Sequence, residues 1–124
     1  MKFITLFALF LPILGISGEI KDILPQKTYV ITAYCNNNGA GCTICNGKWA
    51  KYHKTADGHT PKQGITCAAS RNIPFGTKIA IEGVGTRIVQ DRLALKYDNR
   101  IDVYFNSHKD ALKFGKKQLK VKIL

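Results

Sequence analysis

The alternation of apolar and polar residues along the chain predicts a mainly β protein. Residues 27–35 are rich in β-branched and aromatic side chains, and their alternation places Thr32 and Tyr34 on the face opposite Ile31 and Ala33. Further segments with a strand-like composition are residues 64–69, 77–82, 86–91, 101–105 and 118–124. Because six short strands would expose many unpaired edges, the pattern favours a small closed β-barrel.

Turn and capping signals separate these segments. Residues 83–85, Gly-Val-Gly, are placed to form a hairpin loop between two strands. Residues 107–110, Ser-His-Lys-Asp, form a capping box that begins one short helix, and Gly115 is placed to end it. The side chains that this pattern directs to the core are Ala111, Leu112, Phe114, Leu119, Val121 and Ile123.

Residues 42–62 show little periodicity and many polar side chains, which predicts a long ordered loop that carries cysteines. We expect Trp49 and Tyr52 to pack this loop down onto the barrel. Loops of this length in a small domain are usually functional.

The first residues have the pattern of an export signal. Lys2 gives a positive start, and residues 3–16 are apolar except for Thr5. The small residues at 15–18 suit a signal peptidase, and the apolar run is shorter than the roughly 20 residues that span a bilayer. We therefore expect a signal peptide at 1–18, a leader at 19–26 and one domain at 27–124. The mature protein would reside in the periplasm or the extracellular cell wall, with no integral membrane segment.

The chain is strongly basic, with 19 Lys and Arg against 8 Asp and Glu, a formal charge of +11. In an exported protein this surplus favours an anionic envelope polymer or membrane surface as partner. We do not expect nucleic acid binding, because the chain has no zinc-finger spacing, helix-turn-helix pattern or RNP-like aromatic pair. We expect a monomer.

Four cysteines are candidates for disulfides, since an even number in a small exported domain favours cross-links. They are Cys35, Cys42, Cys45 and Cys67. The competing interpretation is a four-cysteine zinc site, because the spacing of Cys42 and Cys45 suits a metal, although Cys35 and Cys67 stand alone. A redox role for the Cys42/Cys45 pair is a third, weaker alternative. The histidines share no ligand spacing and are expected at the surface: His53, His59 and His108.

Two carboxylates lie at the ends of predicted strands. Asp91 ends the segment 86–91, and Asp102 lies within the β-branched and aromatic segment 101–105. Burial raises the pKa of a carboxyl, and two such acids at adjacent strand ends suit acid–base chemistry on a sugar. In the structural alternative, the two acids only pair with neighbouring cations, which are Arg92, Lys96 and Arg100.

Five motifs occur in the order and spacing of a known family. They are Ile-Pro-Phe-Gly-Thr at 73–77, Ile-Glu-Gly-Val-Gly at 81–85, Gln-Asp at 90–91, Arg-Ile-Asp-Val-Tyr-Phe at 100–105 and Ala-Leu-Lys-Phe-Gly at 111–115. In these motifs the chain resembles the three-Asp (3D) domain family, which includes the barrel of membrane-bound lytic transglycosylase A and the stationary-phase survival muralytic proteins. The resemblance implies a six-stranded double-psi β-barrel, similar to that of expansins, with one short helix and a long cysteine-containing loop.

The resemblance also implies a function. Members of this family cleave the β-1,4 bond between N-acetylmuramic acid and N-acetylglucosamine in peptidoglycan, which forms 1,6-anhydromuramic acid. In this chain Asp102 matches the catalytic acid, and Asp91 matches the acid beside it. The candidates for binding the glycan strand are Thr32, Tyr34, Lys96 and Tyr104. We expect no cofactor and no metal.

The chain departs from the family pattern at two places. The first of the three family acids corresponds to Ala69, five residues before the proline of Ile-Pro. The loop after Asp91 lacks the family's glycines, and Lys96 is displaced by one position. The alternative function is therefore a non-catalytic, expansin-like module that binds peptidoglycan or another wall polysaccharide.

Overall fold

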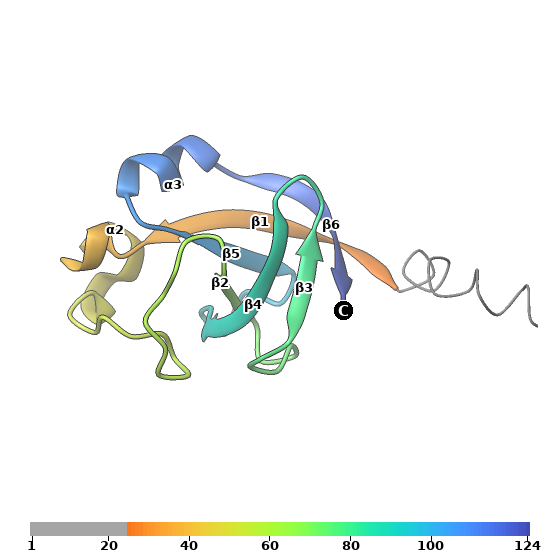
Figure 1. The fold of residues 1–124 in the computed structure, drawn as a ribbon, viewed down its shortest axis with the longest axis horizontal. Coiled ribbons are helices and arrows are strands. Elements are labelled where there is room, and N and C mark those ends of the chain that lie inside the picture. Colours follow the sequence, from red (N-terminus) through yellow and green to blue (C-terminus); the bar gives the residue numbers. More distant parts are fainter. Residues whose placement is uncertain (1–24) are drawn as a thin grey trace, which may run out of the picture.

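The computed structural model describes residues 25–124, so the predicted signal peptide and nearly all of the predicted leader lie outside the described residues. Figure 1 shows the elements along the chain. They are β1 (Gln26–Cys35), α2 (Thr43–Asn46), β2 (Thr66–Ala69), β3 (Lys78–Ile81), β4 (Gly85–Arg92), β5 (Arg100–Phe105), α3 (His108–Phe114) and β6 (Lys117–Ile123), with short 3₁₀ turns at Asn37–Gly39 and Gly47–Trp49.

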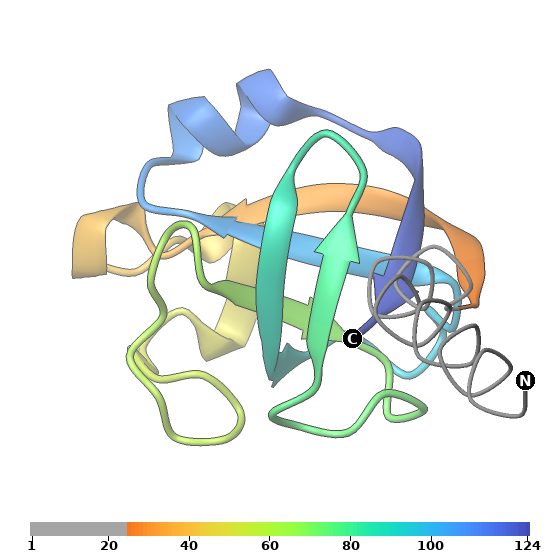
Figure 2. The ribbon, with the colours of Figure 1, turned by 45° about the vertical axis from the view of Figure 1, so that its right-hand side comes forward.

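The six strands form a closed barrel in the order β1-β5-β2-β4-β3-β6. Two neighbouring pairs, β1–β5 and β2–β4, are parallel, and the other four pairs are antiparallel. Figure 2 shows the β3–β4 hairpin standing across the other strands, with α3 above them. Closure pairs both edges of every described strand with a neighbour, which avoids the exposed edges that promote aggregation. The predicted mainly β, six-stranded double-psi barrel is confirmed.

The core lies inside the barrel and is built mostly from β-branched side chains. Strand alternation sends every second residue inward, and the stiff, branched side chains fill the small interior well. The fully buried residues with the largest side chains are Ile31, Ile79, Ile101, Val89, Val103, Val121, Thr66, Cys35 and Cys67.

The pairing of β2 with β4 contains a β-bulge. Cys67 pairs with Val89, but the next residue, Ala68, pairs with Asp91, so Gln90 is an extra residue in β4. Without the bulge, Val89 and Asp91 would face the same side, because side chains alternate with period two. The bulge instead leaves Val89 in the core and turns Asp91 to the outer face, where it is only partly buried.

Helix α3 begins and ends where the sequence predicts. The Ser107 side chain accepts a hydrogen bond from the backbone N–H of Asp110, and Gly115 ends the helix with a φ of 73°. Ala111 faces the barrel and is 5 % exposed, but Leu112 is 67 % exposed, so its predicted inward position is wrong. Adjacent helical residues point about 100° apart, and a short helix lying on a barrel buries only one side.

The prediction of a single helix is wrong, and so are two further predictions about packing. The structure has a second short helix, α2, at the start of the segment predicted to be a loop. Trp49 and Tyr52 are 61 % and 56 % exposed and do not pack that segment onto the core; their rings lie 5.7 Å apart and contact each other. Ile123, the last residue of β6, is 46 % exposed because it lies at the end of its strand.

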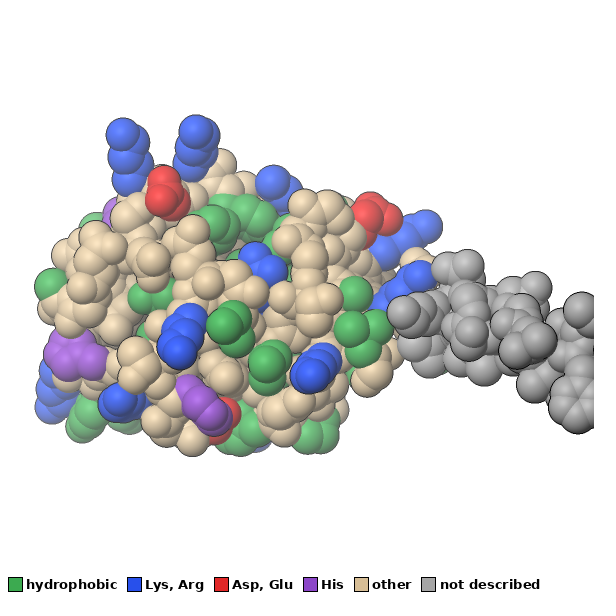
Figure 3. All heavy atoms as spheres, in the orientation of Figure 1, with side chains coloured by type: hydrophobic (Ala, Val, Ile, Leu, Met, Phe, Trp, Pro, Cys, Tyr) green, Lys and Arg blue, Asp and Glu red, His purple; other side chains and the backbone are tan. Residues whose placement is uncertain are grey.

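The surface reflects the basic composition. On the face shown in Figure 3, lysine and arginine side chains are scattered widely and acidic ones are few. Across residues 25–124, no helix is both long and apolar enough to cross a membrane.

The core supports a matched prediction on β3 and β6. Ile79 and Ile123 are cross-strand partners, but Ile79 is 0 % exposed whereas Ile123 is 46 % exposed. We expect Ile79→Ala to lower the free energy of unfolding by about 2–5 kcal/mol, because it leaves a cavity. Ile123→Ala should cost less than about 1 kcal/mol. Urea denaturation of both variants checks this, and equal losses would contradict the packing described.

Candidate functional site

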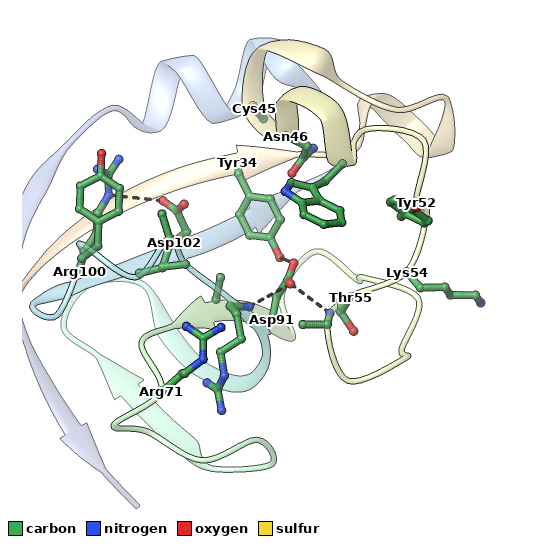
Figure 4. A pocket seen from close by; sticks show the side chains of 17 residues that line it. Tyr34, Cys45, Asn46, Tyr52, Lys54, Thr55, Arg71, Asp91, Arg100 and Asp102 are labelled. Carbon is green, nitrogen blue, oxygen red and sulfur yellow. Dashed lines mark hydrogen bonds and ion pairs between the residues drawn. The ribbon is translucent and has the colours of Figure 1, made fainter.

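A cavity of about 900 Å³ opens on the outer side of the barrel, beside α2. Figure 4 shows how side chains from distant parts of the chain converge on it. The lining residues are Tyr34, Cys45, Asn46, Trp49, Tyr52, Lys54, Thr55, Ala56, Ala68, Arg71, Asp91, Arg92, Leu93, Ala94, Tyr97, Arg100 and Asp102. The cavity is therefore bounded by β1, β2, β4 and β5, by the segment that follows α2, and by the loop after β4.

The two candidate acids meet in this cavity because β2 lies between their strands. Ala68 pairs with Asp91 on the β4 side and with Asp102 on the β5 side. Paired residues on neighbouring strands point to the same face, so both carboxyls project outward on either side of a methyl group. The small side chain of Ala68 leaves space between them for a ligand.

Asp102 is a partly buried carboxyl with polar neighbours. Its side chain is 19 % exposed and accepts a hydrogen bond from the Thr32 hydroxyl. The Arg100 Nε lies 3.9 Å from an Asp102 carboxylate oxygen and donates to the Thr32 hydroxyl at 2.8 Å. Burial raises the pKa of Asp102, and the nearby charge of Asp91 adds to this, while Thr32 and Arg100 act in the opposite direction. The net shift is upward, as a proton donor requires.

Asp91 accepts three hydrogen bonds. The Tyr34 hydroxyl donates to one oxygen at 2.9 Å, and the backbone N–H groups of Ala56 and Arg92 donate to the other at 3.1 and 2.9 Å. Burial and the neighbouring Asp91 raise the pKa of Tyr34 well above 10.0, so this phenol remains a donor. Asp91 therefore fixes Tyr34 and the loop around Ala56 against the strands.

Of the basic side chains considered as partners for the two acids, only Arg100 lies beside one of them. The Arg92 guanidinium donates to backbone carbonyls, including that of Ile73 at 2.8 Å, and its contact with Asp91 is made by its backbone N–H. Lys96 is exposed and does not line the cavity. The alternative in which both acids only form ion pairs with these cations is therefore not supported.

The lining of the cavity also carries exposed aromatic rings and positive charge. Trp49 and Tyr52 project from the segment after α2, and Lys54 and Arg71 line the same cavity. Flat rings of this kind offer apolar faces on which sugar rings can stack, with polar groups at their edges. Tyr52, Lys54 and Arg71 were not predicted from the sequence to belong to the site. Tyr52 and Lys54 lie in the long loop and Arg71 follows β2, and no motif connects these three positions.

The predicted glycan-binding residues occupy different positions. Tyr34 lines the cavity, whereas Thr32 is 6 % exposed and donates a hydrogen bond to Asp102. Tyr104 is 3 % exposed and packs edge-on against Tyr34, with ring centroids 5.5 Å apart. Lys96 points to solvent outside the cavity. Only Tyr34 can contact a ligand directly in this arrangement, and Thr32 and Tyr104 support the groups that do.

The position of the missing family acid is informative. Ala69 is 0 % exposed and belongs to the barrel core, whereas the preceding residue, Ala68, lines the cavity. An acid at position 69 would point to the core side of β2. Its replacement by alanine therefore removes no carboxyl from the cavity that holds Asp91 and Asp102.

The predicted disulfides are not confirmed, because all four cysteines are free. Cys67 lies alone in the barrel core, which also contradicts a zinc site made of the four cysteines. Cys35, Cys42 and Cys45 instead converge on His108, which was expected at the surface and is half-buried.

Comparison with known proteins agrees with this architecture. The profile of the 3D domain matches residues 65–124, which include both acids and five of the six strands. Residues 65–124 of the chain therefore belong to the 3D domain family.

Two relatives are known from Bacillus subtilis strain 168. The putative cell wall shaping protein YabE is 29 % identical over 116 residues, which cover 87 % of this chain and 27 % of YabE. The cell wall-binding protein YocH is 30 % identical over 99 residues, which cover 80 % of this chain and 32 % of YocH. This chain thus spans about a third or less of the length of these relatives.

The environment of Asp102 predicts how stability depends on pH. Folding raises the pKa of Asp102 above its ordinary value of 3.8. The protonated carboxyl therefore contributes fully to the free energy of unfolding below pH 3.8, and this contribution is lost as the pH rises through the raised pKa. Asp102→Asn should therefore have a higher free energy of unfolding than the wild type at neutral pH. The difference between the two proteins should disappear below pH 3.8.

Urea denaturation across this pH range measures the gap. Asp98→Asn is the control, because Asp98 is exposed and outside the cavity. A lower stability of Asp102→Asn at neutral pH would mean that the ion pair with Arg100 outweighs burial.

Proposed function

We propose that this protein is exported to the cell wall, binds peptidoglycan glycan strands in the cavity, and cleaves them as a lytic transglycosylase. The observation that carries the proposal is the pair of carboxyls, Asp91 and Asp102, that face one cavity on either side of Ala68. The names of the relatives, a cell wall shaping protein and a cell wall-binding protein, support the location and the polymer.

Asp102 has the properties of the acid. In the proposed reaction its protonated carboxyl donates the proton to the glycosidic oxygen between N-acetylmuramic acid and N-acetylglucosamine as that bond breaks. The resulting carboxylate then takes the proton of the muramyl C6 hydroxyl, whose oxygen bonds to C1 and closes the 1,6-anhydro ring. The cycle returns Asp102 to its protonated form, and no water is consumed. Burial and the charge of Asp91, which raise the pKa of Asp102, favour the first step.

The other residues have separate tasks in this proposal. Asp91 orients the Tyr34 phenol and the loop at Ala56, and its negative charge stabilises positive charge that develops on the muramyl ring. Trp49 and Tyr52 provide stacking surfaces for flanking sugars. Arg71 and Lys54 attract the acidic groups of the wall polymer.

A second candidate is a binding module without catalysis. Two observations favour it. Asp102 already accepts a hydrogen bond from the Thr32 hydroxyl and lies 3.9 Å from Arg100, and the relative YocH is named a cell wall-binding protein. Under this alternative the exposed rings and the basic surface bind the glycan, and Asp102 only holds Thr32 and Arg100 in place.

The test is to digest purified sacculi with the chain and identify the soluble products by mass spectrometry. We expect fragments that end in 1,6-anhydromuramic acid, and Asp102→Asn should lower their release by at least about 100-fold, because it removes the general acid. Asp98→Asn is the matched control and should keep full activity, since that acid is exposed outside the cavity.

Binding to sacculi is measured on the same variants by sedimentation. The enzyme proposal predicts that Asp102→Asn still binds but does not cleave. Binding by the wild type without any soluble product would reject the enzyme and favour the binding module. Fragments with ordinary reducing ends would instead indicate hydrolysis by water.

A further inference from the structure

Three cysteines and one histidine converge at the end of β1, close to the cavity but separate from its acids. Cys35 ends β1, Cys42 and Cys45 lie just before and within α2, and His108 is the first residue of α3. Their ligand atoms, three Sγ and one His nitrogen, all lie within 4.8 Å of one another. His108 is 63 residues from Cys45 along the chain, so only the fold brings them together.

The distances within this cluster fit a tetrahedral metal ion. The Nδ1 of His108 lies 3.6 Å from the Cys35 sulfur, 3.5 Å from that of Cys42 and 3.4 Å from that of Cys45. The sulfurs of Cys35 and Cys45 are 3.7 Å apart. A tetrahedral zinc ion with Zn–S of about 2.3 Å and Zn–N of about 2.0–2.1 Å requires S···N distances of about 3.6 Å and S···S distances of about 3.8 Å.

The surrounding residues hold the cluster in this shape. The Asn46 side-chain amide donates to the backbone carbonyls of Cys35 at 2.8 Å and of Cys42 at 3.3 Å, so one side chain ties both ligand-bearing segments together. The turn between them requires Gly41, whose φ is +89° and where a Cβ would lie 2.5 Å from the Ala50 carbonyl oxygen. Cys35 and Cys42 are 0 % and 6 % exposed.

We propose that Cys35, Cys42, Cys45 and His108 form a structural Zn²⁺ site. Three thiolates and an imidazole are a ligand set that selects zinc, and the Cys42–Cys45 spacing is that of zinc-binding loops. Four protein ligands fill a tetrahedral shell, so the site has no open position for a substrate and is structural. This replaces the expectation that the chain binds no metal.

A disulfide explains the cluster less well. A bonded pair requires sulfurs about 2.05 Å apart, whereas the sulfurs of Cys35 and Cys45 are 3.7 Å apart and all three cysteines are free. A single disulfide would also use only two of the three sulfurs that surround the His108 Nδ1. The near-equal distances from His108 to all three sulfurs favour a single central ion.

The site would fix one wall of the cavity. Cys45 itself lines the cavity, and the residues that follow α2, including Asn46 and Trp49, continue that wall. A bound ion would join the end of β1, α2 and α3, so the exposed aromatic rings would be held against the barrel without a hydrophobic core of their own. Metal binding and folding of this segment should therefore be coupled.

The test uses the full chain, purified under reducing conditions, loaded with Zn²⁺ and dialysed against metal-free buffer. Native mass spectrometry should find one zinc ion per chain, and denaturing mass spectrometry after exposure to air should find all four thiols reduced. Cys42→Ser and His108→Ala should each lower the zinc content to less than about 0.2 ion per chain.

Matched controls separate the cluster from cysteine and histidine content in general. Cys67→Ala and His53→Ala should keep one zinc ion, because Cys67 lies in the core and His53 is exposed. In the wild type, fluorescence of Trp49, the only tryptophan, should change on adding Zn²⁺ to the metal-free chain and level off at one equivalent. A wild-type chain that retains no metal, or that contains a disulfide among these cysteines, would overturn the proposal.

Discussion

The β-bulge at Gln90 is the constraint on which the candidate site depends. It turns Asp91 out of the barrel and onto the face that Asp102 already occupies, on either side of Ala68. The buried Gln90 side chain is held by the Thr66 hydroxyl at 2.8 Å, so the extra residue is anchored inside the protein. Without the bulge, the Asp91 carboxylate would point into an apolar core, where burying an unpaired charge is very costly. The bulge therefore both keeps the barrel core apolar and places Asp91 in the cavity.

The polar groups in the cavity lower the stability of the fold, and the apolar barrel core compensates for this loss. Asp102 is partly desolvated, which disfavours its charged form, and its neighbours Thr32 and Arg100 compensate only in part. The barrel tolerates this because its interior is filled by branched apolar side chains and its strands are closed into a ring. The alanine at position 69 belongs to that interior, so the chain departs from the three-acid pattern on the core side of β2 and not in the cavity.

The sequence predicted the parts of this structure that depend on local patterns. Alternation predicted all six strands, and the Ser107 cap and Gly115 predicted α3. It could not predict the bulge, because Gln90 continues an unbroken strand pattern and the irregularity exists only in the pairing with β2. Asp91 and Asp102 were predicted to lie together through the family resemblance. The approach of His108 to the cysteines carried no sequence signal, since it arises from the packing of α3 against β1 across most of the domain.

The central claim is that the two carboxyls share one face of the barrel and act on each other. The most direct measurement is an NMR titration of the Asp102 carboxyl in the wild type and in Asp91→Asn, with Asp98→Asn as the control. The charge of Asp91 raises the pKa of Asp102 in this structure. The account therefore predicts a lower Asp102 pKa in Asp91→Asn and no change in Asp98→Asn. An unchanged Asp102 pKa in Asp91→Asn would show that the carboxyls do not share the cavity.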